Sequence, residues 1–290
     1  MVASEHDDTD GAPERSNRFT RGRDPWLAHL GNLRNVVRQE MVSRQLARHL
    51  PAAPARVLDV GAGQGTQALR LVAAGHEVTA VEPDHAMRDV FTTDAARLRP
   101  TERARVSLQA SDLATLSTEA RPATHDVVLC HGVLMYLPES RAAVAELARR
   151  VAPGGILSIV TRNGDALAWR PALRHEWSAA LALLEEVDQS RTEDRAALYR
   201  NEIGVDARAD TLGSLTDDCE AAGLELTAWY GIRVATDDVA LDEPPPDAAH
   251  LATLLDVEER LGSTDPYRAL GTLVHVIASR PGGSVSPADG

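Results

Sequence analysis

The stretch VLDVGAGQGT (residues 57–66) places a glycine-rich turn directly after a short apolar run. Gly61, Gly63 and Gly65 have no Cβ, so the backbone of this turn can approach a ligand closely. A buried strand that ends in such a turn and continues as a helix is the usual place for a nucleotide-like cofactor in an α/β domain. The stretch therefore predicts both the fold class and the position of a cofactor site.

Strand-like and helix-like segments alternate along the rest of the chain. Short apolar runs, typical of strands covered on both faces, occupy residues 55–61, 76–83, 104–113, 125–134, 155–163, 224–234 and 272–280. Apolar residues at helical spacing occupy residues 32–50, 66–75, 84–98, 139–152, 211–223 and 251–261. The alternation predicts an α/β fold with a doubly wound, seven-stranded, mostly parallel, Rossmann-like sheet.

One internal segment, residues 164–210, interrupts the alternation and is mostly helical in pattern. Because it follows the fifth expected strand, we expect a helical lid over the carboxyl edge of the sheet, where ligands of such folds bind. The polar residues 1–22 and 282–290 are expected to form a disordered leader and tail, which leaves one folded domain over residues 23–281.

Composition narrows the function classes. The chain is 43% apolar and 3% aromatic, and its formal net charge of −13 disfavours nucleic acid as a partner. It contains no lysine, which excludes a lysine nucleophile or Schiff base, and its two cysteines favour neither a disulfide framework nor a zinc site. The N-terminus is not a signal peptide, and no apolar run approaches the roughly 20 residues that span a bilayer, so we expect a cytoplasmic protein without a membrane partner. The pattern leaves the oligomeric state open.

Three acids at successive strand ends indicate which cofactor the glycines hold. Asp59 precedes the glycine turn by two residues, where a carboxylate would oppose a pyrophosphate but suit an ammonium group. Glu82 ends the second strand, where it can accept from both ribose hydroxyls, and Asp112 ends the third, where it can accept from an adenine amino group. Thr66 replaces the third glycine of the dinucleotide fingerprint, which disfavours a nicotinamide oxidoreductase. S-adenosylmethionine, a phosphate-free adenosyl cation, fits these features.

The order of these elements over residues 30–281 resembles the class I S-adenosylmethionine-dependent methyltransferases, in which a final antiparallel strand completes the sheet. The resemblance implies an enzyme, although a non-catalytic protein that binds the cofactor is an alternative. It also implies a set of cofactor-binding residues: Arg34, Asp59, Gly61, Ala62 and Gly63 along the methionine part, Glu82 on the ribose, Pro83, Met87, Ser111, Asp112 and Leu113 around the adenine, and His131 and Val133 on the sulfonium side.

The acceptor is less constrained, because two branches of this family share segments with the chain. GRDPWLAHLGNLRNVVRQE (22–40) resembles the mycobacterial 1-O-methyltransferases of methylmannose polysaccharide synthesis, which implies a small saccharide acceptor, the 1-hydroxyl of a short 3-O-methylated mannoside. CHGVLMYL (130–137) and GIRV (231–234) resemble bacterial enzymes that methylate the carboxylate of a wobble carboxymethoxyuridine in tRNA. Arg162-Asn163 departs from the Tyr-Asn of the tRNA branch, and another small-molecule acceptor remains a further alternative.

We expect sugar O-methylation, in which the hydroxyl must lose its proton as it attacks. His131, beside the transferred methyl, is the candidate general base, whereas His275 in the last strand is expected to be structural. Residues of the types that bind sugars or anions are predicted to line the acceptor site: Trp26, Tyr136, Asn163, Asp165, Trp169, Glu202 and Arg233. Asp165 and Glu202 could hold Mg²⁺ with a third acid, but no metal site is predicted.

Overall fold

The central sheet contains seven strands in the order β3-β2-β1-β4-β5-β9-β8. Their bounds are β1 Arg56–Val60, β2 Glu77–Val81, β3 Val106–Gln109, β4 His125–His131, β5 Val151–Arg162, β8 Glu225–Ile232 and β9 Leu273–Ser279. Strands β1 to β5 pair in parallel, and β9 lies antiparallel between β5 and β8. The predicted seven-stranded, mostly parallel sheet is confirmed. The chain reverses its direction of strand addition between β1 and β4, the switch point at which such folds bind ligands.

The computed structural model describes residues 30–119, 123–201 and 204–282. The expected leader, nearly all of the expected tail, Trp26 and Glu202 lie outside the described residues.

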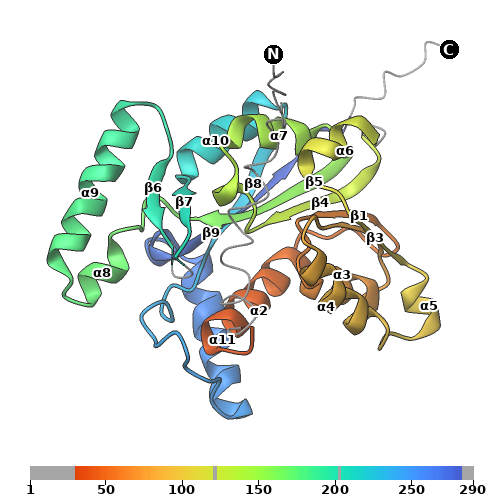
Figure 1. The fold of residues 1–290 in the computed structure, drawn as a ribbon, viewed down its shortest axis with the longest axis horizontal. Helices are drawn as coiled ribbons and strands as arrows, with labels where there is room; N and C mark the ends of the chain where they lie inside the picture. Colours follow the sequence, from red (N-terminus) through yellow and green to blue (C-terminus); the bar gives the residue numbers. More distant parts are fainter. Residues whose placement is uncertain (1–29, 120–122, 202–203, 283–290) are drawn as a thin grey trace, which may run out of the picture.

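Helices cover both faces of the sheet (Figure 1). The helical elements are α2 Leu33–Ala47, α3 Thr66–Ala73, α4 His85–Ala95, α5 Pro100–Arg103, α6 Leu113–Glu119, η1 Leu134–Tyr136, α7 Ser140–Ala148, α8 Trp169–Leu173, α9 Trp177–Thr192, α10 Leu212–Ala221, α11 Ala248–Ser263 and η2 Tyr267–Leu270. One face packs on α7 and α10 through Val144, Leu147 and Leu215. The other packs on α3 and α4 through Leu71 and Phe91.

Two parts of the chain depart from the pattern expected from the sequence. The helix expected to run to Pro153 ends at Ala148, and β5 already begins at Val151. Val151 already pairs with His125 of β4, and the Pro-Gly-Gly segment forms an irregularity of β5 before pairing with β4 resumes at Ile156, with Gly154 at φ +77°. The insertion after β5 contains α8 and α9 but also a two-stranded sheet that was not expected, β6 Ala197–Arg200 with β7 Asp206–Ala209.

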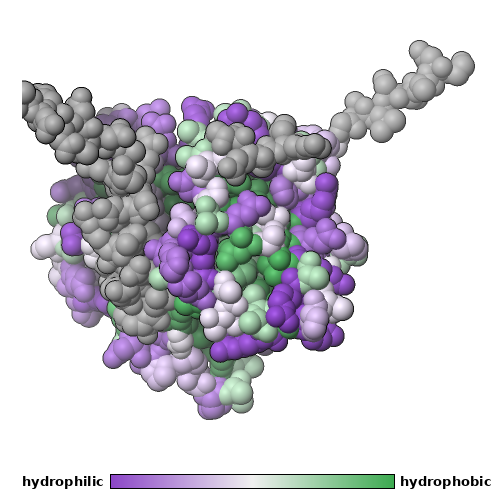
Figure 2. Space-filling model, turned by 45° about the vertical axis from the view of Figure 1, so that its right-hand side comes forward, coloured by the Kyte–Doolittle hydropathy of each residue, from purple (hydrophilic) through white to green (hydrophobic). Residues whose placement is uncertain are grey.

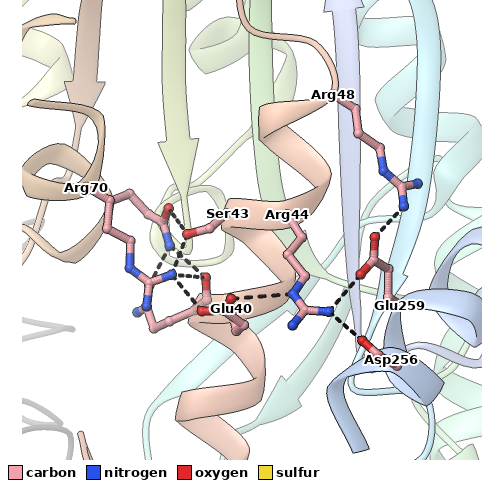
Figure 3. A network of polar contacts seen from close by, with 9 residues as sticks. Glu40, Ser43, Arg44, Arg48, Arg70, Asp256 and Glu259 are labelled. Carbon is pink, nitrogen blue, oxygen red and sulfur yellow. Dashed lines mark hydrogen bonds and ion pairs between the residues drawn. The ribbon is translucent and has the colours of Figure 1, made fainter. Parts of the chain in front are cut away.

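A network of ion pairs connects α2 with its neighbours (Figure 3). Arg44 bonds to Glu259 of α11 at 2.8 Å, and Arg48 bonds to the same carboxylate. On the side of α3, Arg70 bonds to Glu40 at 3.1 Å. Each pair is partly exposed and contributes little alone, about 0–1 kcal/mol. Together they fix the position of α2, which contributes three residues to the sites described below.

The face shown in Figure 2 is mainly hydrophilic, with one group of apolar residues near its centre. Among the described residues, no helix is both long and apolar enough to cross a membrane.

Two helical glycines should respond oppositely to the same substitution. A Cβ on Gly262 in α11 would lie 2.4 Å from the carbonyl oxygen of Gly231, a rigid backbone atom, so Gly262→Ala should lower the free energy of unfolding by about 1–3 kcal/mol. A Cβ on Gly213 in α10 meets nothing closer than 3.8 Å, so Gly213→Ala should be neutral or stabilising by up to about 1 kcal/mol. Urea unfolding of both variants measures the contrast, and equal midpoints would contradict it.

Candidate active site

The glycine-rich turn joins the end of β1 to α3 and is held against the end of β2. The backbone N–H groups of Gly61 and Ala62 both donate to the carbonyl oxygen of Val81, at 2.8 and 3.0 Å. Gly61 has φ +73°, and a Cβ there would lie 2.2 Å from the Val133 side chain. Gly65 has φ +87°, and a Cβ there would lie 2.4 Å from Phe91. At these two positions the protein's own packing already requires glycine.

Two buried carboxylates lie beside this turn. Asp59 is 3% exposed, and its side chain accepts no hydrogen bond from the described residues. Burial, and then the nearby Glu82, raise the pKa of Asp59 to about 7. Glu82 accepts from the N–H groups of Gly63 and Asp84, both at 2.8 Å, while burial raises its pKa. A buried carboxylate without a cation is costly, so this pair suits a positively charged ligand.

The residues expected around an adenine lie at the ends of β2 and β3. Asp112 is exposed and caps α6, where its Oδ1 accepts from the backbone N–H of Thr115 at 2.8 Å. The hydroxyl of Ser111 lies 2.9 Å from the hydroxyl of Thr115, and Leu113 packs against the core. Met87 is buried, with its methyl group 3.4 Å from where a Cβ on Gly63 would lie. The exposed Pro83 precedes α4.

The end of β4 brings His131 next to β5. His131 pairs in register with Val160, and its Nε2 lies 2.9 Å from the hydroxyl of Ser158. Burial, then His275 and Arg38, hold the pKa of His131 well below its usual value, so the ring is neutral at physiological pH. Arg38 of α2 approaches the next residue: a Cβ on Gly132 would lie 2.6 Å from its Nη2.

Four arginines surround one aspartate at the same edge of the sheet. This arginine cluster consists of Arg34 from α2, Arg162 from the end of β5, Arg170 from α8 and Arg233 from the residue after β8. Asp237 lies between them. Its Oδ1 is 3.0 Å from Nη2 of both Arg34 and Arg233, and its Oδ2 is 3.8 Å from Nη1 of Arg170. The structure thus places Arg34, the expected clamp of the cofactor carboxylate, in an ion pair with Asp237, while Arg38 of the same helix lies against Gly132.

One member of the arginine cluster, Arg162, has no direct carboxylate partner among the described residues. Arg162 is 8% exposed, and within the described ranges its guanidinium makes no ion pair or hydrogen bond; it lies over the Tyr199 ring at 5.2 Å. Burial lowers the pKa of Arg162 and of Arg233. Asp237 stays ionised: burial opposes it, but Arg233 and Arg162 hold its pKa well below the usual range. A buried charge without a direct partner is unfavourable, so Arg162 suits an anion.

The other residues expected at the acceptor site serve internal contacts in this structure. Asn163 donates to the carbonyl oxygens of Ala269 and Gly271 at 3.0 and 2.8 Å. Asp165 bonds to Arg191 at 3.0 Å.

Two aromatic residues differ in their exposure. Tyr136 of η1 accepts a hydrogen bond from Asn201 at 3.3 Å and has a charge–charge interaction with Arg38. Trp169 is 42% exposed on α8. Within residues 30–119, 123–201 and 204–282, no group of three His, Cys, Asp or Glu side chains is placed to hold a metal.

The chain is similar to known methyltransferases. Residues 58–159 match a family model described as a methyltransferase domain. The chain is 26% identical to the tRNA 5-carboxymethoxyuridine methyltransferase of Escherichia coli strain K12, over 87% of this chain and 89% of that protein. It is 35% identical to the trans-aconitate 2-methyltransferase of Methylobacterium nodulans, over 39% of this chain and 41% of that protein.

A solved structure has the same fold. It is the 1,6-didemethyltoxoflavin-N1-methyltransferase of Burkholderia thailandensis, with 1,6-didemethyltoxoflavin and S-adenosylhomocysteine bound. The TM-score is 0.54 at 18% identity, over 94% of this chain and 92% of that chain.

The raised pKa of Asp59 predicts a specific pH dependence of stability without cofactor. Its pKa rises from 3.8 to about 7 on folding, so ionisation opposes the folded state increasingly between about pH 4 and pH 7, and fully above that. Asp59→Asn, which cannot ionise, should therefore be more stable than the parent by on the order of 2–4 kcal/mol at pH 8, and much less so at pH 5. Chemical unfolding at the two pH values measures the difference.

Asp126 provides the control of opposite sign. Burial opposes its ionisation, but hydrogen bonds from Arg56 lower its pKa. Asp126→Asn should therefore destabilise the protein at pH 8. If Asp59→Asn and the parent kept parallel stability profiles, the assignment of a buried, uncompensated carboxylate would be wrong.

Proposed function

Because this chain is an S-adenosylmethionine-dependent methyltransferase, we propose that its acceptor is an anion and that the arginine cluster binds a carboxylate of that acceptor, which receives the methyl group as a methyl ester. The observation that carries this proposal is Arg162, a buried guanidinium that has no carboxylate within ion-pair distance among the described residues and interacts with Asp237 only at longer range. It lies at the end of β5, on the edge of the sheet where β1 also ends.

The cofactor half of the site follows from the acids. Asp59 receives the ammonium group of the cofactor, since this buried carboxylate has no cation of its own. Glu82 holds the ribose hydroxyls while it keeps the glycine turn in place through Gly63. Asp112 and Leu113 lie at the adenine. The bound cofactor supplies a methyl group already activated by its positive sulfonium.

The acceptor half requires orientation more than proton transfer. A carboxylate is ionised at neutral pH, so it attacks without a base and needs only alignment and exclusion of water. Guanidinium groups bind carboxylates through paired, charge-assisted hydrogen bonds. Residues 164–210 act as a lid in this proposal, because Arg170 of the insertion belongs to the arginine cluster. The names of two relatives, for 5-carboxymethoxyuridine and for trans-aconitate, describe carboxylate compounds, which supports the same chemistry.

A saccharide hydroxyl is the second candidate, in agreement with the expectation from the sequence. It is favoured by His131, whose neutral ring at the end of β4 could take the proton of an attacking hydroxyl. The exposed Trp169 could stack on a sugar face. The two candidates differ in their product, because alkali hydrolyses a methyl ester, whereas an alkyl ether or methyl glycoside is stable to it.

Arg162→Met tests the carboxylate proposal. Since Arg162 forms no direct ion pair with a described residue, the variant should fold normally, and the KM for a carboxylate acceptor should rise about 10- to 100-fold, as expected for a lost charged hydrogen bond. The Kd for S-adenosylhomocysteine should change by less than about twofold. Activity is measured as transfer of a labelled methyl group to one of three acceptors: trans-aconitate, tRNA bearing carboxymethoxyuridine, or a 3-O-methylated mannobiose. Each product is then treated with alkali to test whether the label is released.

Arg174→Met is the matched control, because Arg174 bonds to Asp238 at a more exposed position outside the cluster. It should leave both constants unchanged. The carboxylate proposal would be refuted in favour of the sugar if the mannoside received a methyl label that resists alkali and if Arg162→Met kept full activity.

A further inference from the structure

A chain of hydrogen bonds runs through the sheet behind His131. Nε2 of His131 lies 2.9 Å from the hydroxyl of Ser158, and that hydroxyl lies 2.8 Å from Nε2 of His275. Nδ1 of His275 lies 2.8 Å from Oε1 of Gln45, whose Nε2 donates to the carbonyl oxygen of Gly231 at 3.1 Å. The chain thus connects β4, β5, β9, α2 and β8. Ser158, His275 and Gln45 are all fully buried, so water does not compete for these bonds.

The carbonyl group of Gly231, at the end of this chain of hydrogen bonds, determines which atom donates in each of the other bonds. The carbonyl of Gly231 can only accept, so the amide nitrogen of Gln45 must face it and the amide oxygen must face His275. Nδ1 of His275 therefore carries a proton, which leaves its Nε2 as an acceptor for the hydroxyl of Ser158. The oxygen of Ser158 then accepts from His131, so Nε2 of His131 carries the proton.

This order leaves Nδ1 of His131 as an unprotonated nitrogen. Nδ1 is buried and has no hydrogen-bond partner among the described residues. Burial also lowers the pKa of His275, to about 3, so neither ring gains a second proton at physiological pH. A buried acceptor without a donor is unfavourable, so this nitrogen fits a ligand that brings an N–H or O–H group.

We propose that Ser158, His275 and Gln45 are positioning residues that fix the tautomer of His131, so that its Nδ1 accepts a hydrogen bond from a bound ligand. Two ligands carry such a donor: the ammonium group of the cofactor and the hydroxyl of an acceptor. The tautomer itself does not depend on the proposed function, whereas the identity of the donor rests on the methyl-transfer site proposed above.

Nitrogen NMR of the ¹⁵N-histidine-labelled protein tests the tautomer directly, before any ligand is added. The unmodified protein should show His131 with an unprotonated Nδ1 and a protonated Nε2. Ser158→Ala removes the acceptor of Nε2, so the ring should change to a mixture of tautomers, and Ser158→Thr, which keeps the hydroxyl, should restore the original signals. Ser190→Ala, which removes another buried hydroxyl outside the chain, is the control and should change nothing.

Ligand titrations identify the donor. If it is the ammonium group, S-adenosylhomocysteine should shift the Nδ1 signal, an analogue without the amino group should not, and Ser158→Ala should weaken S-adenosylhomocysteine about threefold to tenfold. If it is a hydroxyl, 3-O-methylated mannobiose should shift the signal instead. A protonated Nδ1 in the unmodified protein, no change in Ser158→Ala, or no response to either ligand would overturn the proposal.

Discussion

The carboxyl edge of the sheet buries opposite charges in two separate places, and the rest of the site depends on this separation. Asp59 and Glu82 lie on the side of β1, and no arginine contributes to the shift in the pKa of Asp59. The arginine cluster lies on the side of β5 and β8, where Asp237 forms ion pairs with Arg34, Arg170 and Arg233. Pairing these charges with one another would stabilise the fold but would leave no partner for a ligand. In the proposed function, the cationic methyl donor completes one side and an anionic acceptor completes the other.

The position of α2 brings its side chains to several parts of the site. Its first turns carry Arg34 to the arginine cluster and Arg38 to Gly132, next to the transferred methyl in the proposed arrangement. Further along, Gln45 enters the buried hydrogen-bond chain at His275. The helix is itself held by surface ion pairs to α3 and α11 (Figure 3). A helix that precedes the sheet in sequence therefore joins the strand ends into one site.

The sequence predicted most of the sheet, because its strands are short apolar runs and its first turn has a glycine pattern with a direct steric cause. It did not predict β6 and β7, whose side chains alternate weakly, or the early start of β5, which depends on pairing with β4. Of the arginine cluster, the sequence singled out Arg233 for the acceptor and Arg34 for the cofactor, but not Arg162 or Arg170. Arg162 and Asp237 lie 75 residues apart in the sequence and interact through their charges only because β9 brings the ends of β5 and β8 together. The hydrogen-bond chain likewise depends on the register of His131 and His275 against Val160, which no local pattern reveals.

The absence of lysine from the chain has a consequence at this edge. Burial lowers the pKa of Arg170, and of Arg38, to about 10, so both side chains remain fully charged at neutral pH. A lysine starts near 10.4, and a shift of the same size would bring its pKa to about 8, where about a tenth of the side chains are neutral at pH 7. A buried cluster that must stay cationic before its anion binds can therefore be built from arginine far more easily than from lysine. Composition and site chemistry agree in this respect, whatever the origin of the composition.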